Sequence, residues 1–175
     1  ESMGIGIGVE KMLNNSFSIS QDVSYIFHVD ERSFVRMDVE DVWGLRSVTE
    51  LRKYLNTTDL PESGWFVSAD LRNIYTNSEI EAQTIENELI KYQTGRYRGS
   101  LNINAGILFF LDPQKESRIT FELMGGAGIG YFNSASDINS DEINSRSYIL
   151  ATDAANGSRF YPNPNLDFKI GYLLK

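Results

Sequence analysis

Strict alternation of apolar and polar residues is the feature that most constrains this chain. Between Gly4 and Phe27, GIGIGVEKML is followed by NNS and then by FSISQDVSYIF, so that apolar side chains recur at every second position. Period two places alternate side chains on opposite faces of a β-strand. Asn14 and Asn15 suit a tight turn, because asparagine tolerates positive φ. The stretch therefore predicts an antiparallel hairpin with one apolar and one polar face.

The same alternation recurs along the rest of the chain. Five further strands are predicted, at Val42–Leu55, Gly64–Tyr75, Tyr97–Leu111, Arg118–Phe132 and Asn165–Leu174. The stretch RSVTELRKYL also has helical spacing, but the two-residue period continues back through Trp43 and favours a strand. The sequence thus predicts seven strands.

Charged and polar stretches separate these strands. Long connections are predicted at Asp30–Glu40, at Thr76 to about Gly95, where IEAQTIENELIKY could form a short helix, and at Asn133–Asn163. Short connections are NNS, NTTDLPES and DPQKE, so short and long connections alternate along the chain. Membrane β-barrels sort their connections in this way, with short periplasmic turns at one end and long extracellular loops at the other.

Composition narrows the function classes. The net charge of −8 argues against nucleic acid as a partner, because phosphate binding needs a basic surface. The absence of cysteine excludes a disulfide framework, and a single histidine argues against a zinc site. No apolar run reaches the roughly 18–20 residues of a membrane-spanning helix. We expect no cofactor and no bound metal.

These features together predict an all-β fold. The expected architecture is an antiparallel up-and-down transmembrane β-barrel of about eight strands, formed by a single domain over residues 1–175 and located in the cell outer membrane. A soluble sandwich or a lipocalin-like ligand barrel would also show alternation, with the apolar face turned inward. Large aromatic residues at both ends of the apolar faces argue against these two alternatives.

The polar face carries most of the charge. Six acids and five bases are expected to line the interior, namely Glu10, Asp22, Glu50, Asp70, Glu122, Asp167, Arg46, Arg52, Arg72, Arg98 and Lys169. A small barrel has an interior just wide enough for side chains to fill. The near balance of charge therefore predicts a packed ion-pair network rather than a channel.

Within this network, Arg52, Arg72 and Arg98 are expected to pair with acids of neighbouring strands, chiefly Glu50, Asp70 and Glu122. The glycines at positions 4, 6, 8, 126, 128 and 130 share the inward face. They are expected to leave room for long arginine side chains from the opposite wall.

Several of these stretches resemble a known class. GIGIGVEKML–NNS–FSISQDVSYIF, TELRKYL followed by GWFVSADLRN, GGAGIGYF and LDFKIGYLL are similar to small outer-membrane β-barrels of Bacteroidota, in the eight-stranded OmpA/OmpX-like class and near an uncharacterised family within it. The resemblance implies that an acid and an arginine two residues apart point into the barrel, and Glu50 and Arg52 match this pattern.

The chain departs from that class in two ways. One further strand would precede the first strand seen here, and closed bacterial barrels have an even number of strands. The eighth strand would then lie outside this sequence, within the long loop at Ser145–Ala151, or on a partner. The last residues are YLLK, where the class commonly ends in an aromatic residue.

Two catalytic or metal-binding patterns are weak. His28 precedes Asp30, Glu31 and Ser33, from which a serine–histidine–acid set can be drawn, but a hydrogen-bonding histidine at the rim is favoured. Asp137, Asn139 and Asp141 resemble the start of a calcium loop. Glu142 stands where that loop needs glycine, and Tyr148 stands where it needs glutamate, so a solvated acidic loop is favoured.

The function expected from the sequence is therefore not enzymatic. A small outer-membrane barrel with a packed charged lumen would act as a structural or accessory subunit of the envelope or of an outer-membrane complex. Its partners would be outer-membrane lipid and other outer-membrane proteins. The alternative is a barrel that binds or transports a small apolar ligand.

Overall fold

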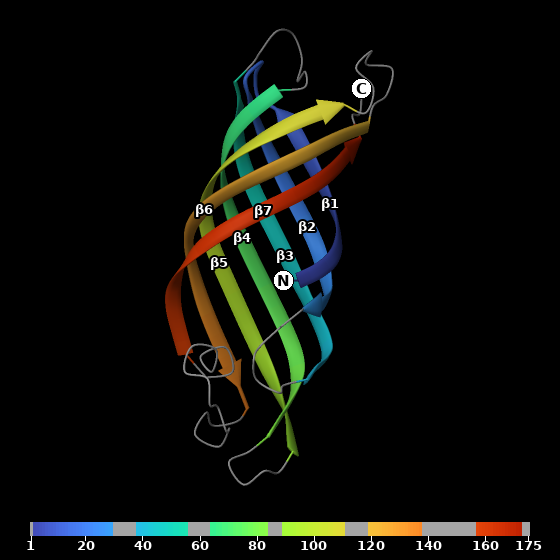
Figure 1. The fold of residues 1–175 in the computed structure, drawn as a ribbon, viewed down its shortest axis with the longest axis vertical. Coiled ribbons are helices and arrows are strands. Elements are labelled where there is room, and N and C mark those ends of the chain that lie inside the picture. The colour runs from blue at the N-terminus through green and yellow to red at the C-terminus, as the bar shows by residue number, and fades with distance from the viewer. Residues whose placement is uncertain are drawn as a thin grey trace.

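Seven antiparallel strands form one sheet in chain order (Figure 1). The computed structural model describes residues 2–29, 38–55, 64–83, 89–110, 119–137 and 157–172. The strands are β1 (Ser2–Met12), β2 (Phe17–Val29), β3 (Asp38–Tyr54), β4 (Gly64–Gln83), β5 (Leu89–Phe110), β6 (Ile119–Ser136) and β7 (Gly157–Tyr172). The all-β, up-and-down architecture is confirmed, and RSVTELRKYL lies in β3 rather than in a helix. The described residues contain no helix with the length and apolar character needed to cross a membrane.

The sheet curls so that its two edges approach each other. Figure 1 shows β7 crossing in front of the central strands, on the same side as the start of β1. β1 pairs with β2 and β7 pairs with β6, and these two strands are the ends of the sheet order. The arrangement is that of a β-barrel whose sheet is not closed between β1 and β7.

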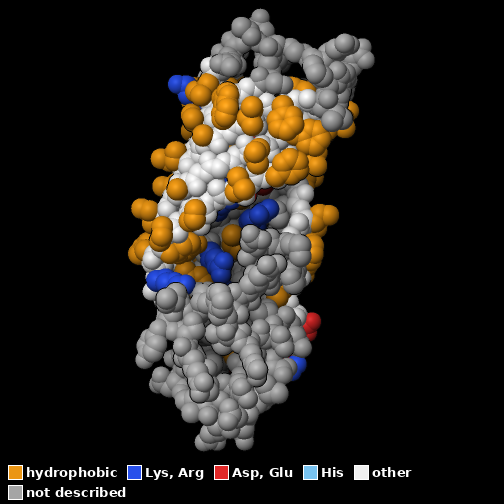
Figure 2. Space-filling model, viewed as in Figure 1, with side chains coloured by type: hydrophobic (Ala, Val, Ile, Leu, Met, Phe, Trp, Pro, Cys, Tyr) orange, Lys and Arg blue, Asp and Glu red, His pale blue; other side chains and the backbone are white. Residues whose placement is uncertain are grey.

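Apolar side chains point out of the curled sheet and polar side chains point in. On β5, for example, Ile103 is 74% exposed whereas Asn102 is fully buried. Figure 2 shows the result on one face, where hydrophobic side chains cover the strands. The outward face has a polar interruption at Gln21, Ser47 and Thr49, whose side chains hydrogen-bond to one another at 2.6–3.0 Å. A soluble sandwich would place the apolar residues on the buried face instead.

Exposed aromatic residues gather along two rows of the outward face. Near the short turns, Trp65 of β4 lies in register, through Ile107 and Leu123, with Phe168 of β7. Further along the strands, Tyr25 of β2 lies in register, through Leu45, with Tyr75 of β4 and Tyr97 of β5. Rings within the two rows also contact one another: Phe121 stacks on Phe109 and on Phe168, whereas Trp43 with Tyr75 and Tyr131 with Phe160 form tilted pairs.

The longest pair of strands extends into a region predicted as a loop. The β4–β5 register runs on from Tyr75↔Tyr97 to Gln83↔Leu89. The predicted loop at 76–95 and its short helix are therefore wrong, except that residues 84–88 lie outside the described part. Backbone pairing between two strands does not require an apolar face, so a polar extension carries little hydrophobic signal.

Two other predicted loops are shorter than expected. β6 continues to Ser136 and β7 begins at Gly157, with Ser134 paired to Gly157, so both ends of the loop predicted at 133–163 are strand. β3 begins at Asp38, within the loop predicted at 30–40. The candidate eighth strand at 145–151 lies outside the described residues.

The first turn lies at Asn14 and Asn15 as predicted, but neither asparagine has positive φ, and a side-chain hydrogen bond shapes the turn instead. The side-chain Oδ1 of Asn14 accepts hydrogen bonds from the backbone N–H groups of Ser16 and Phe17, both at 2.9 Å. Such an asparagine side chain mimics a backbone turn and fixes the hairpin register.

The inward glycines lie in close contact with the neighbouring strands. A Cβ on Gly6 or Gly8 would collide with Ser24 or Asp22 of β2, the strand next to it. A Cβ on Gly126 or Gly128 would meet Asn104 or Asn102 of β5, and one on Gly130 would meet the ring of Tyr161. The groups nearest to these glycines therefore belong to the adjacent strand, and no arginine is among them, although Gly6 and Gly8 line a cavity that Arg46 and Arg72 also line.

Candidate functional site

The polar face of the curled sheet forms a charged interior. Residues two apart on a strand share a face, so Glu50 and Arg52 of β3 both point inward, as do Asp70 and Arg72 of β4. All four side chains are buried. Burial of a charge costs free energy unless it is paired, so their partners decide what this interior does.

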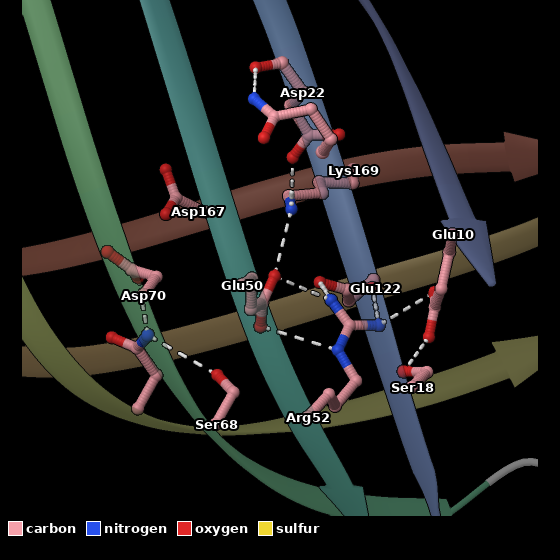
Figure 3. Close-up of polar contacts among 12 residues, drawn as sticks. Glu10, Ser18, Asp22, Glu50, Arg52, Ser68, Asp70, Glu122, Asp167 and Lys169 are labelled. Carbon is pink, nitrogen blue, oxygen red and sulfur yellow. Dashed lines mark hydrogen bonds and ion pairs between the residues drawn. The ribbon is translucent and has the colours of Figure 1, made fainter. Parts of the chain in front are cut away.

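Arg52 is the centre of a first cluster (Figure 3). Its Nη2 donates to Glu50 Oε2 at 2.9 Å and to Glu122 Oε1 at 3.0 Å. Its Nη1 donates to Glu122 Oε2 at 2.8 Å and to Glu10 Oε2 at 3.3 Å. One guanidinium thus joins carboxylates from β1, β3 and β6, strands that are far apart in the sheet order.

Apolar and hydroxyl groups surround the same guanidinium. The ring of Phe66 lies 4.3 Å from the Arg52 Cζ, and Phe66 packs with Tyr54, Leu108 and Met124 in the buried hydrophobic cluster. The Tyr54 hydroxyl donates to Glu10 Oε1 at 2.7 Å, and the Ser18 hydroxyl donates to the same oxygen. These contacts hold Glu10 and exclude water from one side of Arg52.

Asp70 and Arg72 form a second cluster. Arg72 Nε and Nη2 donate to the two oxygens of Asp70, each at 2.9 Å, and Nη2 also donates to Asp167 of β7. Asn102 and Asn104 of β5 donate to the two Asp70 oxygens at 2.7 and 2.6 Å. The Asp70 carboxylate, only 1% exposed, is therefore compensated on both oxygens.

Lys169 links the last strand to the first half of the sheet. Its Nζ donates to Asp22 Oδ2 of β2 at 2.8 Å and to Glu50 Oε2 of β3 at 3.3 Å. Figure 3 shows Lys169 between these two carboxylates. The three cations Arg52, Arg72 and Lys169 thus connect six carboxylates, those of Glu10, Glu50, Glu122, Asp70, Asp167 and Asp22.

The structure differs from the expectation at Arg98. Its in-register neighbours are Ile74 and Phe132, and its guanidinium lies 5.4 Å from the ring centre of Phe132. Among the residues that the structure describes, no carboxylate forms an ion pair with it. Arg46, on the same row, donates from Nη2 to Ser24 at 3.2 Å and likewise has no ion pair with a described residue.

Sequence reasoning overlooked the uncharged members of the network. Tyr54 follows Arg52 by two residues, and Asn104 follows the buried Asn102 by two residues, so each shares a strand face with an inward polar side chain. That spacing was the available signal. What the sequence did not indicate was which strand across the interior each side chain would meet.

The catalytic and metal-binding patterns gain no support. The described residues contain no group of three or more histidine, aspartate or glutamate side chains placed to hold a metal ion. Asp137, the first residue of the candidate calcium loop, accepts a hydrogen bond on Oδ1 from the backbone N–H of Gln93 at 3.1 Å. The side chain of His28 and the rest of the candidate loop lie outside the described part.

Comparisons of the chain with protein-family models, with curated proteins and with solved structures found no match. The charged interior and the apolar exterior therefore carry the functional argument.

Proposed function

We propose that this chain spans the bacterial outer membrane as a small, non-enzymatic β-barrel with a packed charged lumen. It would act as a structural or accessory subunit of the envelope or of an outer-membrane complex. The observation that carries the proposal is the inversion of polarity: buried ion pairs fill the interior around Arg52, whereas large apolar side chains are exposed outside. In water this arrangement would be unfavourable, but in lipid the exposed apolar surface is the favoured one.

The spacing of the two aromatic rows supports a membrane location. On β4, Trp65 belongs to one row and Tyr75 to the other. Ten residues at about 3.3 Å each, tilted by about 35–45°, span about 23–27 Å along the membrane normal. Outer-membrane barrels have an apolar band about 25 Å tall, flanked by aromatic girdles at both interfaces.

The interior supports a structural role over transport. A cavity of about 210 Å³ is lined by Asp22, Arg46, Arg72, Asp167 and Lys169 together with Ser24, two glycines and apolar side chains. Pockets for small molecules usually measure about 300–1,000 Å³ and are mostly apolar. A charged cavity of this size suits neither an apolar ligand nor a conducting pore.

The experiment that tests the proposal is fractionation followed by co-purification. A tagged chain should appear in the outer-membrane fraction, resist extraction by alkaline carbonate, and bring down a partner in fixed ratio after gentle solubilisation. Recovery in the soluble periplasm would contradict the membrane location. Recovery in the membrane without any partner would favour an envelope-stabilising barrel over a subunit of a complex.

A further inference from the structure

The gap between the two edge strands, β1 and β7, is called the seam here, and its geometry suits one additional strand. Six antiparallel pairings connect β1 to β7, so β1 and β7 run in the same direction. A direct β1–β7 ladder would be parallel in an otherwise antiparallel sheet. One inserted strand running the opposite way would be antiparallel to both edges, and each edge would then gain the partner that an exposed strand lacks.

The seam is narrow and already bridged by side chains. Lys169 of β7 reaches Asp22 of β2 at 2.8 Å, across the position of β1. The cavity described above is lined by Gly6 and Ile7 of β1 and by Lys169 and Ile170 of β7. Because Ile7 and Ile170 are outward side chains, 79% and 66% exposed, this cavity opens to the outer surface between the edges. Figure 2 shows basic side chains at the bottom of such a hollow.

Prolines on β7 mark where pairing can occur. Pro162 and Pro164 lie in the first half of the strand and offer no N–H, and proline within a sheet is confined to edge strands. From Leu166 to Tyr172 the strand contains no proline, and this is the half that shares the cavity with β1. The acceptor groove is therefore β1 on one side and residues 166–172 of β7 on the other.

The charge at the seam specifies the chemistry of the occupant. Arg46 lines the cavity, its Nε has no hydrogen-bond partner, and its guanidinium extends towards Ser24, which lies opposite Gly6 of β1. An acidic side chain beside Gly6 would meet it. The inward positions must otherwise be small, because the cavity is small, and the outward positions must be apolar to continue the surface of Ile7 and Ile170.

We propose that the β1–β7 seam binds one extended segment of a partner polypeptide as a strand antiparallel to both edges. The segment has apolar residues facing outward and small polar residues facing inward, with one acid opposite Arg46. The pairing of the segment stands on the edge geometry, since backbone pairing at an edge strand occurs in either medium, whereas its apolar outward face rests on the proposed membrane location.

Cross-linking of the folded full-length chain in detergent tests the proposal. The chain contains no cysteine, so single substitutions are unique attachment points. The probe is an eleven-residue peptide of alternating valine and serine with a central inward glutamate and a cysteine in place of the outward valine at either position 3 or position 7, the positions that face Val9 and Ile5 when the glutamate lies beside Gly6. Ile5→Cys and Val9→Cys report on β1, Ile170→Cys reports on β7, and Ile103→Cys, exposed in the middle of the sheet, is the matched control.

The expected cross-links depend on the direction in which the peptide runs along β1. The cysteine at peptide position 3 should react with Val9→Cys and the cysteine at position 7 with Ile5→Cys, because the segment runs antiparallel to β1. Ile170→Cys should also react, and all three should exceed the Ile103→Cys control by at least about tenfold. Replacing the peptide glutamate by lysine should weaken binding about tenfold, and Arg46→Glu should reverse that preference.

Three results would overturn the proposal. Equal reaction at Ile103→Cys would show general adsorption to the apolar surface. A disulfide between two copies of Ile7→Cys without peptide would assign the seam to a second copy of the chain. If Ile7→Cys fails to react with a small thiol reagent before peptide is added, and no dimer forms, the chain itself already covers the seam.

Discussion

Arg52 of β3 and Glu122 of β6 form a two-pronged ion pair, with Nη1–Oε2 at 2.8 Å and Nη2–Oε1 at 3.0 Å. Two strands lie between β3 and β6 in the sheet, so these side chains meet only because the sheet curls. Bidentate pairing of this kind fixes geometry as well as charge. The stability lost when this pair is removed therefore measures how well the interior is packed.

Removal of Arg52 should destabilise the fold strongly. Arg52→Met leaves Glu50 and Glu122 buried without their main partner, which costs about 3–5 kcal/mol when one member of a buried pair is lost. The midpoint of thermal unfolding in detergent micelles should fall clearly. Lys53→Met is the control: it changes the adjacent, exposed residue, whose ammonium lies over the Phe17 ring, and should cost no more than about 1 kcal/mol.

Removal of both partners should lower the free energy of unfolding less than removal of Arg52 alone. Adding Glu122→Gln to Arg52→Met takes away an uncompensated buried charge, so part of the lost stability should return. Unfolding in urea measures the free energy of each variant. If single and double variants unfold like the parent chain, the interior is hydrated rather than packed, and the ligand-binding alternative would take first place.

The two aspartates that hold Arg72 should differ in importance. Asp70 is almost fully buried and also accepts hydrogen bonds from Asn102 and Asn104, whereas the Asp167 side chain is 22% exposed beside the seam. Asp70→Asn should therefore cost about 3 kcal/mol and Asp167→Asn about 1 kcal/mol. The same urea titration gives both values, and equal costs would contradict the graded burial seen in the structure.

Alternation in the sequence predicts which residues share a face, and this is why the inward position of Glu50 and Arg52 could be expected. It does not predict which strands meet across the interior, because that depends on how far the sheet curls. The contact of Arg52 with Glu122 and that of Lys169 with Asp22 join strands across the interior and could not be predicted. Strand ends beyond the apolar band, such as Ser78 to Gln83, were missed because only two of their residues, Ile80 and Ala82, are apolar, which is too short an alternation to mark a strand.

The packed interior should not conduct ions. Arg52, Arg72 and Lys169 reach into the lumen from three strands, β3, β4 and β7, so a permeating ion would have to displace existing pairs. Purified chain in planar lipid bilayers should show no stable open level at moderate voltage. Reproducible large channels would mean that the ion pairs do not fill the cross-section.

A charge placed in the middle of the outer face should oppose membrane insertion. Ile103→Arg introduces a cation between the two aromatic rows, where arginine costs about 2–4 kcal/mol in a barrel. Leu13→Arg, beside the first turn, should cost no more than about 1 kcal/mol because an interfacial cation stays hydrated. Folding yield into lipid vesicles compares the two variants. Equal yields would argue that the outer face does not contact lipid.

The most direct test of the account uses the only two tryptophans, Trp43 and Trp65, which lie in different aromatic rows and are about half exposed. The chain is folded into vesicles of lipids that carry bromine either near the headgroup or near the bilayer centre, and Trp43→Phe and Trp65→Phe separate the two signals. Both tryptophans should be quenched, and more strongly by the headgroup-proximal bromine, because girdle residues lie at the interfaces. Absence of quenching at both positions would contradict a lipid-facing outer surface.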